Sequence, residues 1–211
     1  MTTPDTPLRL FIALDLPDAW KHALEALQRD MQTAIDASLG PNIRPRWVRP
    51  EGIHLTLKFL GDTPAKRLDA LTSALAQAVP AAPGFDLTLA RVGAFEQRRV
   101  PRVILATIAS EGRAFIDLYE HIETWLAAAG WPRETRTFRA HLTLARLPDT
   151  FDDTTRRAVA GLATTFEAPQ APAWHVERVY LIRSHLGPGG ARYEQLAAFP
   201  NDALQARSPH I

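Results

Sequence analysis

The feature that most constrains this chain is a nine-residue segment that occurs twice, 87 residues apart. Residues 54–62 read HLTLKFLGD and residues 141–149 read HLTLARLPD, so the two copies agree at six of nine positions. Apolar and polar residues alternate at the start of each copy, which is the pattern of a strand with one buried face. A fold that accommodates both copies must therefore contain two equivalent strands.

Alternation predicts which side chains share a face in each of these strands. The histidine and the threonine should lie on one face and the leucines on the other. In the first copy the same rule predicts that Phe59 lies on the face opposite His54. Two such strands side by side would gather two imidazoles and two hydroxyls around one small cleft. These side chains are His54, Thr56, His141 and Thr143.

A duplication of the sequence alone could explain why both copies contain a histidine, without any function for it. The rest of the chain, however, differs far more between its two halves than these nine residues do. A buried core does not need a histidine at the same register twice. The repeat therefore favours a shared chemical function for the histidine and the threonine of both copies. The structure tests this interpretation by showing whether the two copies lie together.

Composition narrows the class of protein. The 211 residues are 46% apolar, enough for one sizeable core or for two lobes that share one. The net charge of +1 is too small for the protein as a whole to attract nucleic acid or a membrane surface. Any basic patch that binds them must therefore be local. The absence of cysteine excludes disulfides, thiol catalysis and cysteine-bound metal. Residues 8–16 are too short and too charged for a signal peptide or a membrane span, so we expect a soluble, cytoplasmic protein.

Hydrophobic periodicity predicts strand, helix, motif strand, helix and hairpin, followed by helix, motif strand, helix and hairpin. The 17 prolines lie at element boundaries and form no linker. We therefore expect an α+β fold, a single bilobal domain over residues 1–211. Its two pseudo-symmetric lobes, each an antiparallel sheet with helices packed outside, would surround a central cleft. The predicted strands are 8–14, 53–60, 85–95, 103–109, 176–185 and 193–199, with the second motif strand from 141; the predicted helices are 18–37, 64–79, 111–129 and 152–163, with turns at 96–101 and 187–190 and a loose tail at 1–7.

Two basic connectors lead into the motif strands. Residues 42–50 carry three arginines around Trp47, between prolines, and residues 131–139 carry three more. The first connector is either a solvated loop with Trp47 packed on the core or a lip that binds anions beside the first motif, and the sequence favours neither interpretation. The six arginines are Arg44, Arg46, Arg49, Arg133, Arg136 and Arg139.

The repeated residues limit the chemistry. Two histidines on separate strands lack a third ligand at metal spacing, and there is no HExxH, so we expect no metal site. A serine hydrolase is not indicated, because there is no GxSxG elbow. Two imidazoles suit paired acid–base catalysis near neutral pH. Phosphodiester cleavage by in-line displacement needs such a pair on opposite sides of phosphorus, and threonine hydroxyls can donate hydrogen bonds to the non-bridging oxygens.

The paired HxTx motifs resemble those of the two-histidine phosphoesterase superfamily. Their context resembles its bacterial and archaeal branch, the RNA 2′,3′-cyclic phosphodiesterases, also called 2′-5′ RNA ligases. The resemblance covers nearly the whole chain. The supporting stretches are 9–13 (RLFIA), 47–50 (WVRP) ahead of the first motif, 138–146 (FRAHLTLAR), and 181–193 with Ser184 and Gly190 before Tyr193.

The resemblance implies a metal-independent enzyme, without cofactor, that opens a terminal RNA 2′,3′-cyclic phosphate to a 2′-phosphate and has reversible 2′-5′ RNA ligase activity. It assigns proton donation to His54 and proton acceptance to His141. Thr56 and Thr143 are expected to bind substrate. Arg146 resembles a family arginine near the phosphate, although strict alternation would turn it away from His141 unless a bulge or strand end intervenes. The first copy has a phenylalanine at that position.

Two alternatives remain open at this stage. Members of the superfamily act on other small phosphodiesters, such as cyclic ADP-ribose phosphate, 2′-5′ oligoadenylate or the uridine ends of small RNA. The motifs do not discriminate among these, and the surrounding sequence favours RNA ends. A non-catalytic module could instead hold RNA ends through the arginine-rich connectors, although binding alone needs no protonatable pair. We expect RNA ends or small nucleotides as partners, no membrane, and a monomer.

Overall fold

The structure is a computed structural model that describes residues 6–80, 84–97, 99–187 and 190–200. The first half of the chain forms β1 (Leu8–Asp15), α1 (Asp18–Leu39), β2 (Arg46–Trp47), a 3₁₀ helix η1 (Pro50–Gly52), β3 (His54–Thr63), a second 3₁₀ helix η2 (Ala65–Arg67), α2 (Leu68–Ala78), β4 (Asp86–Gln97) and β5 (Val100–Ser110). The second half forms α3 (Ala114–Ala128), β6 (His141–Arg146), α4 (Asp153–Ala163), β7 (Trp174–His175), β8 (Arg178–Gly187) and β9 (Gly190–Pro200).

The elements follow the predicted order, and each predicted helix and long strand is present. The structure adds the two-residue strands β2 and β7, which are too short to leave a periodic pattern. The strands of the hairpin β4–β5 reach Gln97 and Val100 and so extend into the predicted turn 96–101, of which residue 98 lies outside the described residues. Of the predicted turn at 187–190, residues 188–189 lie outside the described residues, as do residues 1–5 of the predicted tail.

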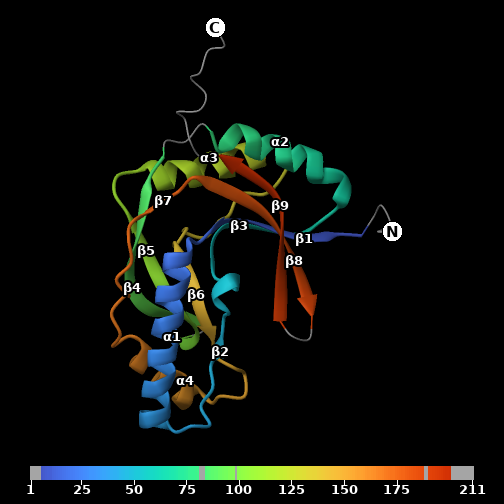
Figure 1. The fold of residues 1–211 in the computed structure, drawn as a ribbon. Helices are drawn as coiled ribbons and strands as arrows, with labels where there is room; N and C mark the ends of the chain where they lie inside the picture. Colours follow the sequence, from blue (N-terminus) through green and yellow to red (C-terminus); the bar gives the residue numbers. More distant parts are fainter. Residues whose placement is uncertain (1–5, 81–83, 98, 188–189, 201–211) are drawn as a thin grey trace.

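All nine strands belong to one sheet, and all of their pairings are antiparallel (Figure 1). The order is β7-β4-β5-β6-β3-β1-β8-β9, with β2 added beside β6. The two motif strands, β3 and β6, are therefore neighbours at the centre. Leu55 and Leu142 are the registered partners between them. The repeated segment thus lies at the pseudo-twofold centre of the molecule.

The two lobes are built from interleaved parts of the chain. One contains β3, β1, β8 and β9, and the other contains β6, β5, β4 and β7. The hairpin β4–β5 follows the first motif strand in sequence but pairs with the second one, through β5. The C-terminal hairpin β8–β9 returns to the first lobe by pairing with β1. The predicted α+β fold with two lobes is confirmed, but each lobe takes its hairpin from the other half of the chain.

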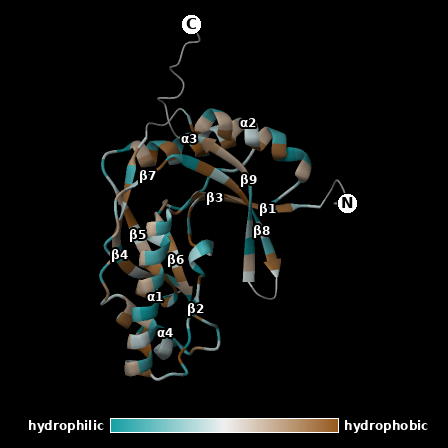
Figure 2. Ribbon diagram, in the orientation of Figure 1, coloured by the Kyte–Doolittle hydropathy of each residue, from teal (hydrophilic) through white to brown (hydrophobic). Residues whose placement is uncertain are grey.

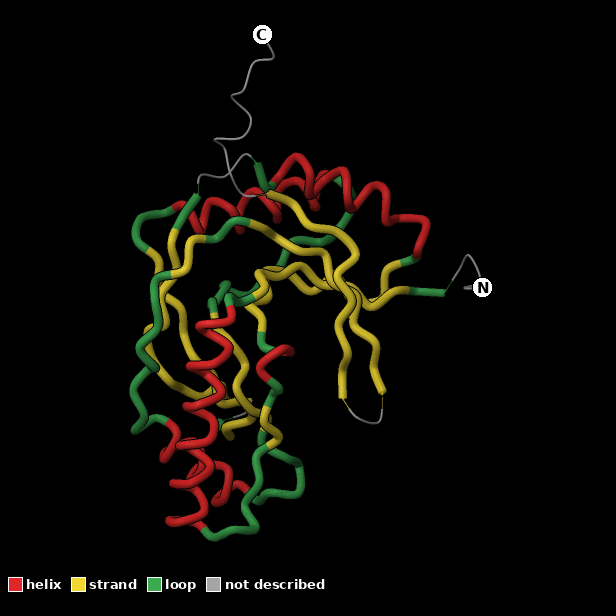
Figure 3. The backbone as a smooth tube through the Cα atoms, viewed as in Figure 1, coloured by secondary structure: helices red, strands yellow, loops and turns green. Residues whose placement is uncertain are grey.

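The helices and the sheet enclose one large core. α1 packs against α4, which lies on β5 and β4, while α2 packs against α3 (Figure 3). The buried positions of α1 recur every three or four residues, and Figure 2 shows apolar and polar residues alternating along it. Strand residues such as Ile12, Leu55 and Leu142 complete this core, each with no exposed surface. Truncating one of these to alanine should cost about 2–5 kcal/mol of stability.

We call the side of the sheet that bears this core the helix face and the other side the open face. The open face carries a small separate cluster of Phe11, Ala13 and Ile182, with Tyr180 packed against it. Because strand residues alternate between faces, Phe11 and Ala13 lie opposite Ile12 and Leu14 of the same strand. None of the described helices combines the length and the apolar character that a membrane span requires.

Candidate active site

His54 and Thr56 lie on the open face of β3. Their partners on β1 are Asp15 and Ala13, and Ala13 belongs to the small cluster of the open face. Leu55, which lies between them, has no exposed surface and packs in the core on the helix face. The alternation predicted for the start of the first motif is therefore confirmed.

His141 and Thr143 occupy the same face of β6. Leu142 between them is fully buried in the core. Because Leu142 is the partner of Leu55, the histidine and the threonine of each copy flank this central pair on the opposite face. The structure thus brings together all four side chains that the sequence singled out. They come from two neighbouring strands and are related by the pseudo-twofold axis.

A backbone carbonyl two residues upstream holds each imidazole. The Nδ1 of His141 lies 2.7 Å from the carbonyl oxygen of Arg139, and the ring of His54 hydrogen-bonds the backbone of Gly52. This bond assigns the proton of neutral His141 to Nδ1, so Nε2 is its basic nitrogen. The same local design in both copies leaves each ring with one nitrogen available for a ligand.

Aromatic rings surround the two imidazoles unequally. His54 lies between Phe11 and Tyr193, with ring centroids at 4.7 and 4.9 Å. His141 packs edge-on against Phe95, at 4.5 Å. The first motif therefore has the more apolar surroundings, although its sequence is nearly that of the second.

This difference sets the charge of His54. Burial lowers the pKa of His54 to about 4, and the charge of His141 acts in the same direction. The hydrogen bond to Gly52 and the carboxylate of Asp15 act against this shift without cancelling it. In the free protein, His54 is therefore neutral at neutral pH.

A β-bulge lies at the last residue of each HxTx tetrapeptide. In β6 the register against β5 shifts by one residue at Leu144. Without the shift, alternation would turn Arg146 to the helix face. With the shift, Arg146 lies opposite Val103, on the side of β5 that carries the partners of His141 and Thr143. The bulge therefore brings Arg146 to the open face beside the second motif, as its predicted role requires.

The first motif strand has a bulge at the equivalent residue, Leu57. Phe59 consequently lies opposite Phe11 on the open face, where its side chain is 70% exposed. The prediction that Phe59 faces away from His54 is therefore wrong. Lys58 takes the buried position on the helix face instead. Strict alternation could not foresee this, because one extra residue in a strand reverses the face of every residue after it.

Sequence reasoning missed the residue that holds the second bulge, Gln28 of α1. Its Nε2 donates hydrogen bonds to the carbonyl oxygens of Leu144 and Val48, each at 2.9 Å. The backbone nitrogen of Val48 also donates to the Leu144 carbonyl, at 2.9 Å. Gln28 is buried among the apolar residues of α1, and a polar residue in that stripe was the signal that could have identified it.

Lys58 holds the first bulge through a buried ion pair that sequence reasoning also missed. Its Nζ lies 2.6 Å from Oε1 of Glu123 on α3 and donates to the carbonyl of Pro132 at 2.9 Å. The other carboxylate oxygen of Glu123 accepts from the backbone nitrogen of Glu134, at 3.0 Å. The pair therefore ties the first motif strand to the connector that leads into the second. Nothing in the sequence pattern distinguishes Lys58 from an exposed strand lysine.

The structure divides the six connector arginines into two groups. Arg44 pairs with Asp36, Arg136 pairs with Glu134, and Arg133 donates to the Thr124 hydroxyl. The side chains of the other three have no hydrogen bond or ion pair with any residue that the structure describes. These are Arg46, Arg49 and Arg139.

Arg46 is distinguished among these by its neighbour. It is the β2 residue directly opposite Arg146, on the same face of the sheet. Trp47, next to it, packs partly buried against the core and donates from its indole nitrogen to Gln32, at 2.8 Å. The packing of Trp47 expected for a connector anchored to the core is confirmed. Arg46 lies beside the second motif rather than the first, and anion binding by this connector stays a prediction.

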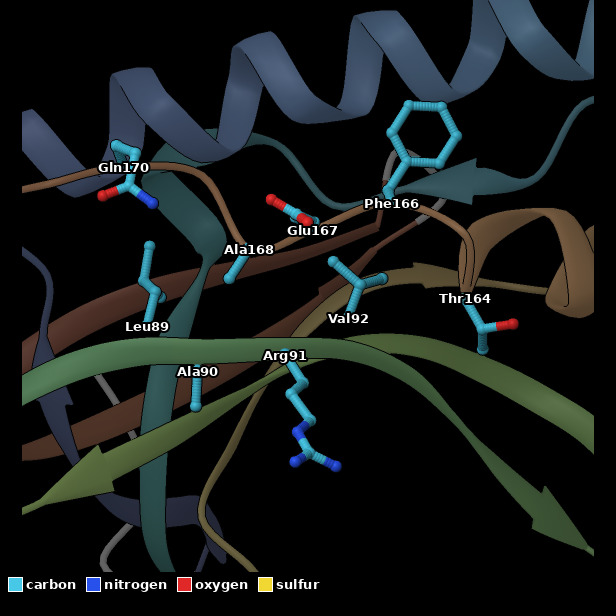
Figure 4. Close-up of a pocket in the computed structure, with 9 residues that line it drawn as sticks. All are labelled: Leu89, Ala90, Arg91, Val92, Thr164, Phe166, Glu167, Ala168 and Gln170. Atoms are coloured by element: carbon cyan, nitrogen blue, oxygen red, sulfur yellow. The ribbon is translucent and has the colours of Figure 1, made fainter.

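Two hollows lie elsewhere on the molecule. One, of about 380 Å³, lies between β4 and residues 164–170 (Figure 4). There Leu89 and Val92 point toward the 166–170 segment, whereas Arg91 points to the other side of β4. The second, of about 310 Å³, lies between α1 and residues 47–50. Neither is lined by His54 or His141, so neither is the candidate active site.

Within the described part of the chain, no three histidine, cysteine or acidic side chains are grouped so that they could hold a metal ion. The site instead presents two imidazoles, two hydroxyls and one guanidinium. Such a set can exchange two protons and can bind an anion through hydrogen bonds and charge.

Comparisons with known proteins agree with this chemistry. A family model described as LigT like Phosphoesterase matches residues 14–105 and 108–193. The RNA 2′,3′-cyclic phosphodiesterase of Geobacillus stearothermophilus is 28% identical over 193 residues, which are 90% of this chain but only 56% of that relative. The enzyme of the same name from Thermus thermophilus is 32% identical over 210 residues, with 91% of this chain and 89% of the relative covered.

The fold comparison gives the same result. The crystal structure of E. coli LigT complexed with 3′-AMP superposes with a TM-score of 0.65 at 26% sequence identity, covering 92% of this chain and 98% of that one. The family match spans most of the sequence and includes both motif strands. The chain therefore belongs to the LigT-like phosphoesterase family.

Proposed function

We propose that the protein hydrolyses the terminal 2′,3′-cyclic phosphate of RNA to a 2′-phosphate, with His54 as the proton donor and His141 as the proton acceptor. The observation that carries the proposal is the pair of imidazoles on neighbouring antiparallel strands, each oriented by the backbone two residues upstream. The names of the curated relatives support RNA cyclic phosphate as the substrate. The complex of E. coli LigT with 3′-AMP supports a nucleotide ligand.

In the proposed step, a water oxygen attacks phosphorus while its proton passes to Nε2 of His141. The bond between phosphorus and O3′ breaks on the opposite side, and O3′ takes a proton from His54. One phosphorus–oxygen bond forms and one breaks, so the product carries a 2′-phosphate and a 3′-hydroxyl. When an RNA 5′-hydroxyl takes the place of water, the same step joins two ends by a 2′-5′ linkage, which is the proposed ligase activity.

The low pKa of His54 in the free protein is compatible with its role as donor. An anion beside an imidazole favours the charged form, so His54 takes up its proton as the phosphate binds. Thr56 and Thr143 donate hydrogen bonds to the non-bridging oxygens, and Arg146 adds a charge-assisted contact. Removing one such donor should lower kcat by roughly 10²–10³-fold. We further propose that residues 1–211 act as one bilobal domain and as a monomer.

An oligonucleotide that ends in a 2′,3′-cyclic phosphate tests the proposal in the presence of excess EDTA. We expect a 2′-phosphate product, identified by phosphorus NMR. His54→Ala and His141→Ala should each lose most activity, and the double variant should be little worse than either, because the two act as a unit. His22→Ala, on α1, is the matched control and should retain activity. A 3′-phosphate product, or activity that survives the loss of either active-site histidine, would contradict the proposal.

A second substrate separates the roles of the two histidines. A phosphodiester with a p-nitrophenolate leaving group needs no proton on departure. With it, His54→Ala should recover much of its rate, whereas His141→Ala should stay impaired because the attacking water still needs a base. The opposite pattern would exchange the donor and the acceptor.

A further inference from the structure

Arg91 of β4 reaches the open face through a β-bulge. The register of β4 against β5 shifts by one residue between Leu89 and Arg91, so that Ala90 is the extra residue. Without the shift, alternation would place Arg91 opposite Ala106, in the core. With the shift, Arg91 lies opposite Thr107. Figure 4 shows the result, because Arg91 points to the other side of β4 from Leu89.

This position aligns Arg91 with the second motif. Thr107 is the β5 partner of His141, which lies on the open face. His141, Thr107 and Arg91 are therefore successive members of one row across β6, β5 and β4. Because neighbouring strands lie about 4.8 Å apart, the Cα atoms of Arg91 and His141 are about 10 Å apart. The row leads away from β3, and so away from His54.

The bulge is held by a hydrogen bond, whereas the guanidinium of Arg91 is not. The hydroxyl of Thr107 donates to the backbone carbonyl of Arg91, at 3.3 Å. The Arg91 side chain is exposed and has no hydrogen bond or ion pair with any residue that the structure describes. Asp86 shares the open face of β4, since its neighbour Leu87 lies in the core, but its carboxylate is bonded to His175 at 2.8 Å. The guanidinium is therefore available to an anionic ligand.

The proposed reaction indicates which anion can reach Arg91. In-line displacement places the nucleophile beside His141 and the leaving O3′ beside His54. The space beyond His141, away from His54, is therefore the side from which the nucleophile enters. A water molecule needs no cation two strands away from the base that activates it. An RNA 5′-hydroxyl, in contrast, is followed by a phosphate on the far side of its ribose.

We propose that Arg91 binds the first phosphate of an RNA strand whose 5′-hydroxyl replaces water as the nucleophile. This inference rests on the proposed function, which places His141 next to the nucleophile. The 5′-oxygen bonds to phosphorus as its proton passes to His141, the bond to O3′ breaks, and O3′ takes the proton of His54. One ribose separates the 5′-oxygen from the bound phosphate, and the long arginine side chain covers the remaining distance. Arg91 thereby favours ligation over hydrolysis.

Competition between the two nucleophiles tests the inference in the full-length protein. The donor is an RNA oligonucleotide with a 5′-phosphate and a terminal 2′,3′-cyclic phosphate, so it cannot act as its own acceptor. The acceptors are a dinucleoside monophosphate with a free 5′-hydroxyl and its methylphosphonate analogue, which lacks the negative charge. For the charged acceptor, Arg91→Gln should lower the ratio of ligated to hydrolysed product roughly 5-fold, the upper range for an exposed ion pair. For the uncharged acceptor, the ratio should not change.

Two further variants show whether the charge at this place matters. Arg91→Lys keeps the charge and should retain most of the wild-type ratio. Arg157→Gln removes an exposed arginine of α4, which packs on the helix face, and it is the matched control. It should leave the ratio unchanged for both acceptors. The difference between wild type and Arg91→Gln should shrink as salt is raised. Because Arg91 is exposed, an unchanged melting temperature of Arg91→Gln checks that the fold is intact.

The outcomes separate this inference from the proposed function. If Arg91→Gln lowers the ratio equally for both acceptors, or for neither, Arg91 does not bind the acceptor phosphate. If the wild type hydrolyses the donor but ligates neither acceptor, the inference is wrong and the proposed hydrolysis stands. If neither product forms, the proposed function is wrong and the inference falls with it.

Discussion

Two residues with the same local design, His54 and His141, differ in what surrounds them. One aromatic ring contacts His141, whereas two enclose His54. Burial is the main cause that lowers the pKa of His54 to about 4, and the charge of His141 adds to it. A phosphate between the two rings opposes both effects, because its negative charge stabilises imidazolium. His54, the proposed donor, is therefore expected to acquire its proton together with the substrate.

We expect the ring of His54 to titrate well below the ordinary pKa of 6.5 in the free protein, near 4. With inorganic phosphate or adenosine 3′-monophosphate bound, its pKa should rise. Proton NMR across pH 3.5–8 measures both, and the spectrum of His54→Gln assigns the resonance. A pKa near 6.5 in the free protein that no ligand moves would show that His54 is not buried as described.

The same shift predicts how stability depends on pH. The unfolded chain protonates His54 near pH 6.5 and the folded chain only near pH 4. In that window the unfolded state binds more protons, so the free energy of unfolding rises with pH and falls as the pH is lowered. One group shifted by this much accounts for at most about 3 kcal/mol.

Denaturant unfolding of the wild type and of His54→Gln between pH 4 and pH 7 measures this contribution. Carboxylates titrate in both proteins, so the difference between the two curves isolates the histidine. We expect the stability of the wild type to decrease more steeply toward pH 4 than that of His54→Gln. Parallel curves would mean that His54 is solvated in the folded state.

At the scale of elements, the bulges at Leu57 and Leu144 determine which side chains the motif strands place on the open face. The bulge in β6 depends on α1, because Gln28 supplies hydrogen bonds to the carbonyls of Leu144 and Val48. Gln28→Leu keeps the volume and removes both bonds. The Leu144 carbonyl keeps its hydrogen bond from the Val48 nitrogen, whereas the Val48 carbonyl loses its bond from Gln28. An unsatisfied carbonyl costs about 1–3 kcal/mol, so we expect a loss of stability of that order. We also expect kcat/KM to fall, because Arg146 loses its position.

A double-mutant cycle separates these two effects. In an Arg146→Ala background, Gln28→Leu should lower kcat/KM no further, since the residue that it positions is already absent. Thr33→Val, also on α1, is the control. It loses only a hydrogen bond to the Arg29 carbonyl within the same helix, so its effect should add to that of Arg146→Ala. If the effects of Gln28→Leu and Arg146→Ala on kcat/KM also add, Gln28 contributes only to stability and does not position Arg146.

The buried pair of Lys58 and Glu123 ties β3 to α3 and to the second connector. Lys58→Met leaves the carboxylate buried without its partner, which should cost about 3–5 kcal/mol. Adding Glu123→Leu should restore much of this loss, because an apolar pair of similar volume is often as stable as a buried ion pair. The free energy of unfolding measures both variants.

An exposed ion pair gives the comparison for this prediction. Arg113 and Asp117 lie at i and i+4 at the start of α3, with 73% and 36% of their side chains exposed. Arg113→Ala should cost less than about 1 kcal/mol. If Lys58→Met costs no more than Arg113→Ala, the ion pair is not buried in solution.

These bulges also mark the limit of sequence reasoning at this scale. Period-2 alternation correctly placed His54 and His141 with their threonines, because the first three residues of each copy precede the bulge. It placed Phe59 on the wrong face, because the residue after a bulge changes face without any change in composition. In the first copy the order is Lys-Phe and in the second Ala-Arg, so no single polarity pattern reveals the bulge. Only the β-sheet register shows it.

For the whole molecule, the periodic pattern predicted two lobes but not their exchange of hairpins. Each hairpin is a local signal, whereas its partner strand lies far along the chain: β5 pairs with β6 and β8 with β1. The consequence for function is that residues of both halves of the chain surround each motif. Phe11 and Tyr193, from opposite ends of the described chain, meet at His54.

The strand β2 adds a positive charge to the part of the site beside the second motif. Arg46 lies directly opposite Arg146 on the same face, and like charges at this spacing repel. Neither side chain has a hydrogen bond or ion pair within the part of the chain that the structure describes. If Arg146 contacts the scissile phosphate, as proposed, a second phosphate beside Arg46 would relieve the remaining repulsion. We therefore expect the RNA chain beyond the terminal nucleotide to pass Arg46.

Arg46→Gln should weaken the binding of a cyclic-phosphate oligonucleotide more than that of a cyclic mononucleotide, because only the oligonucleotide has a phosphate to place there. The salt dependence of oligonucleotide affinity should flatten by about one unit in the slope of log K against log salt, as expected for one lost phosphate contact. Arg44→Gln, from the same connector, is the matched control: Arg44 already pairs with Asp36, so its loss should affect both substrates little. Affinities measured from 50 to 300 mM salt decide the matter. If Arg46→Gln weakens both substrates equally, Arg46 contacts the scissile phosphate together with Arg146, and the RNA chain leaves the site by another route.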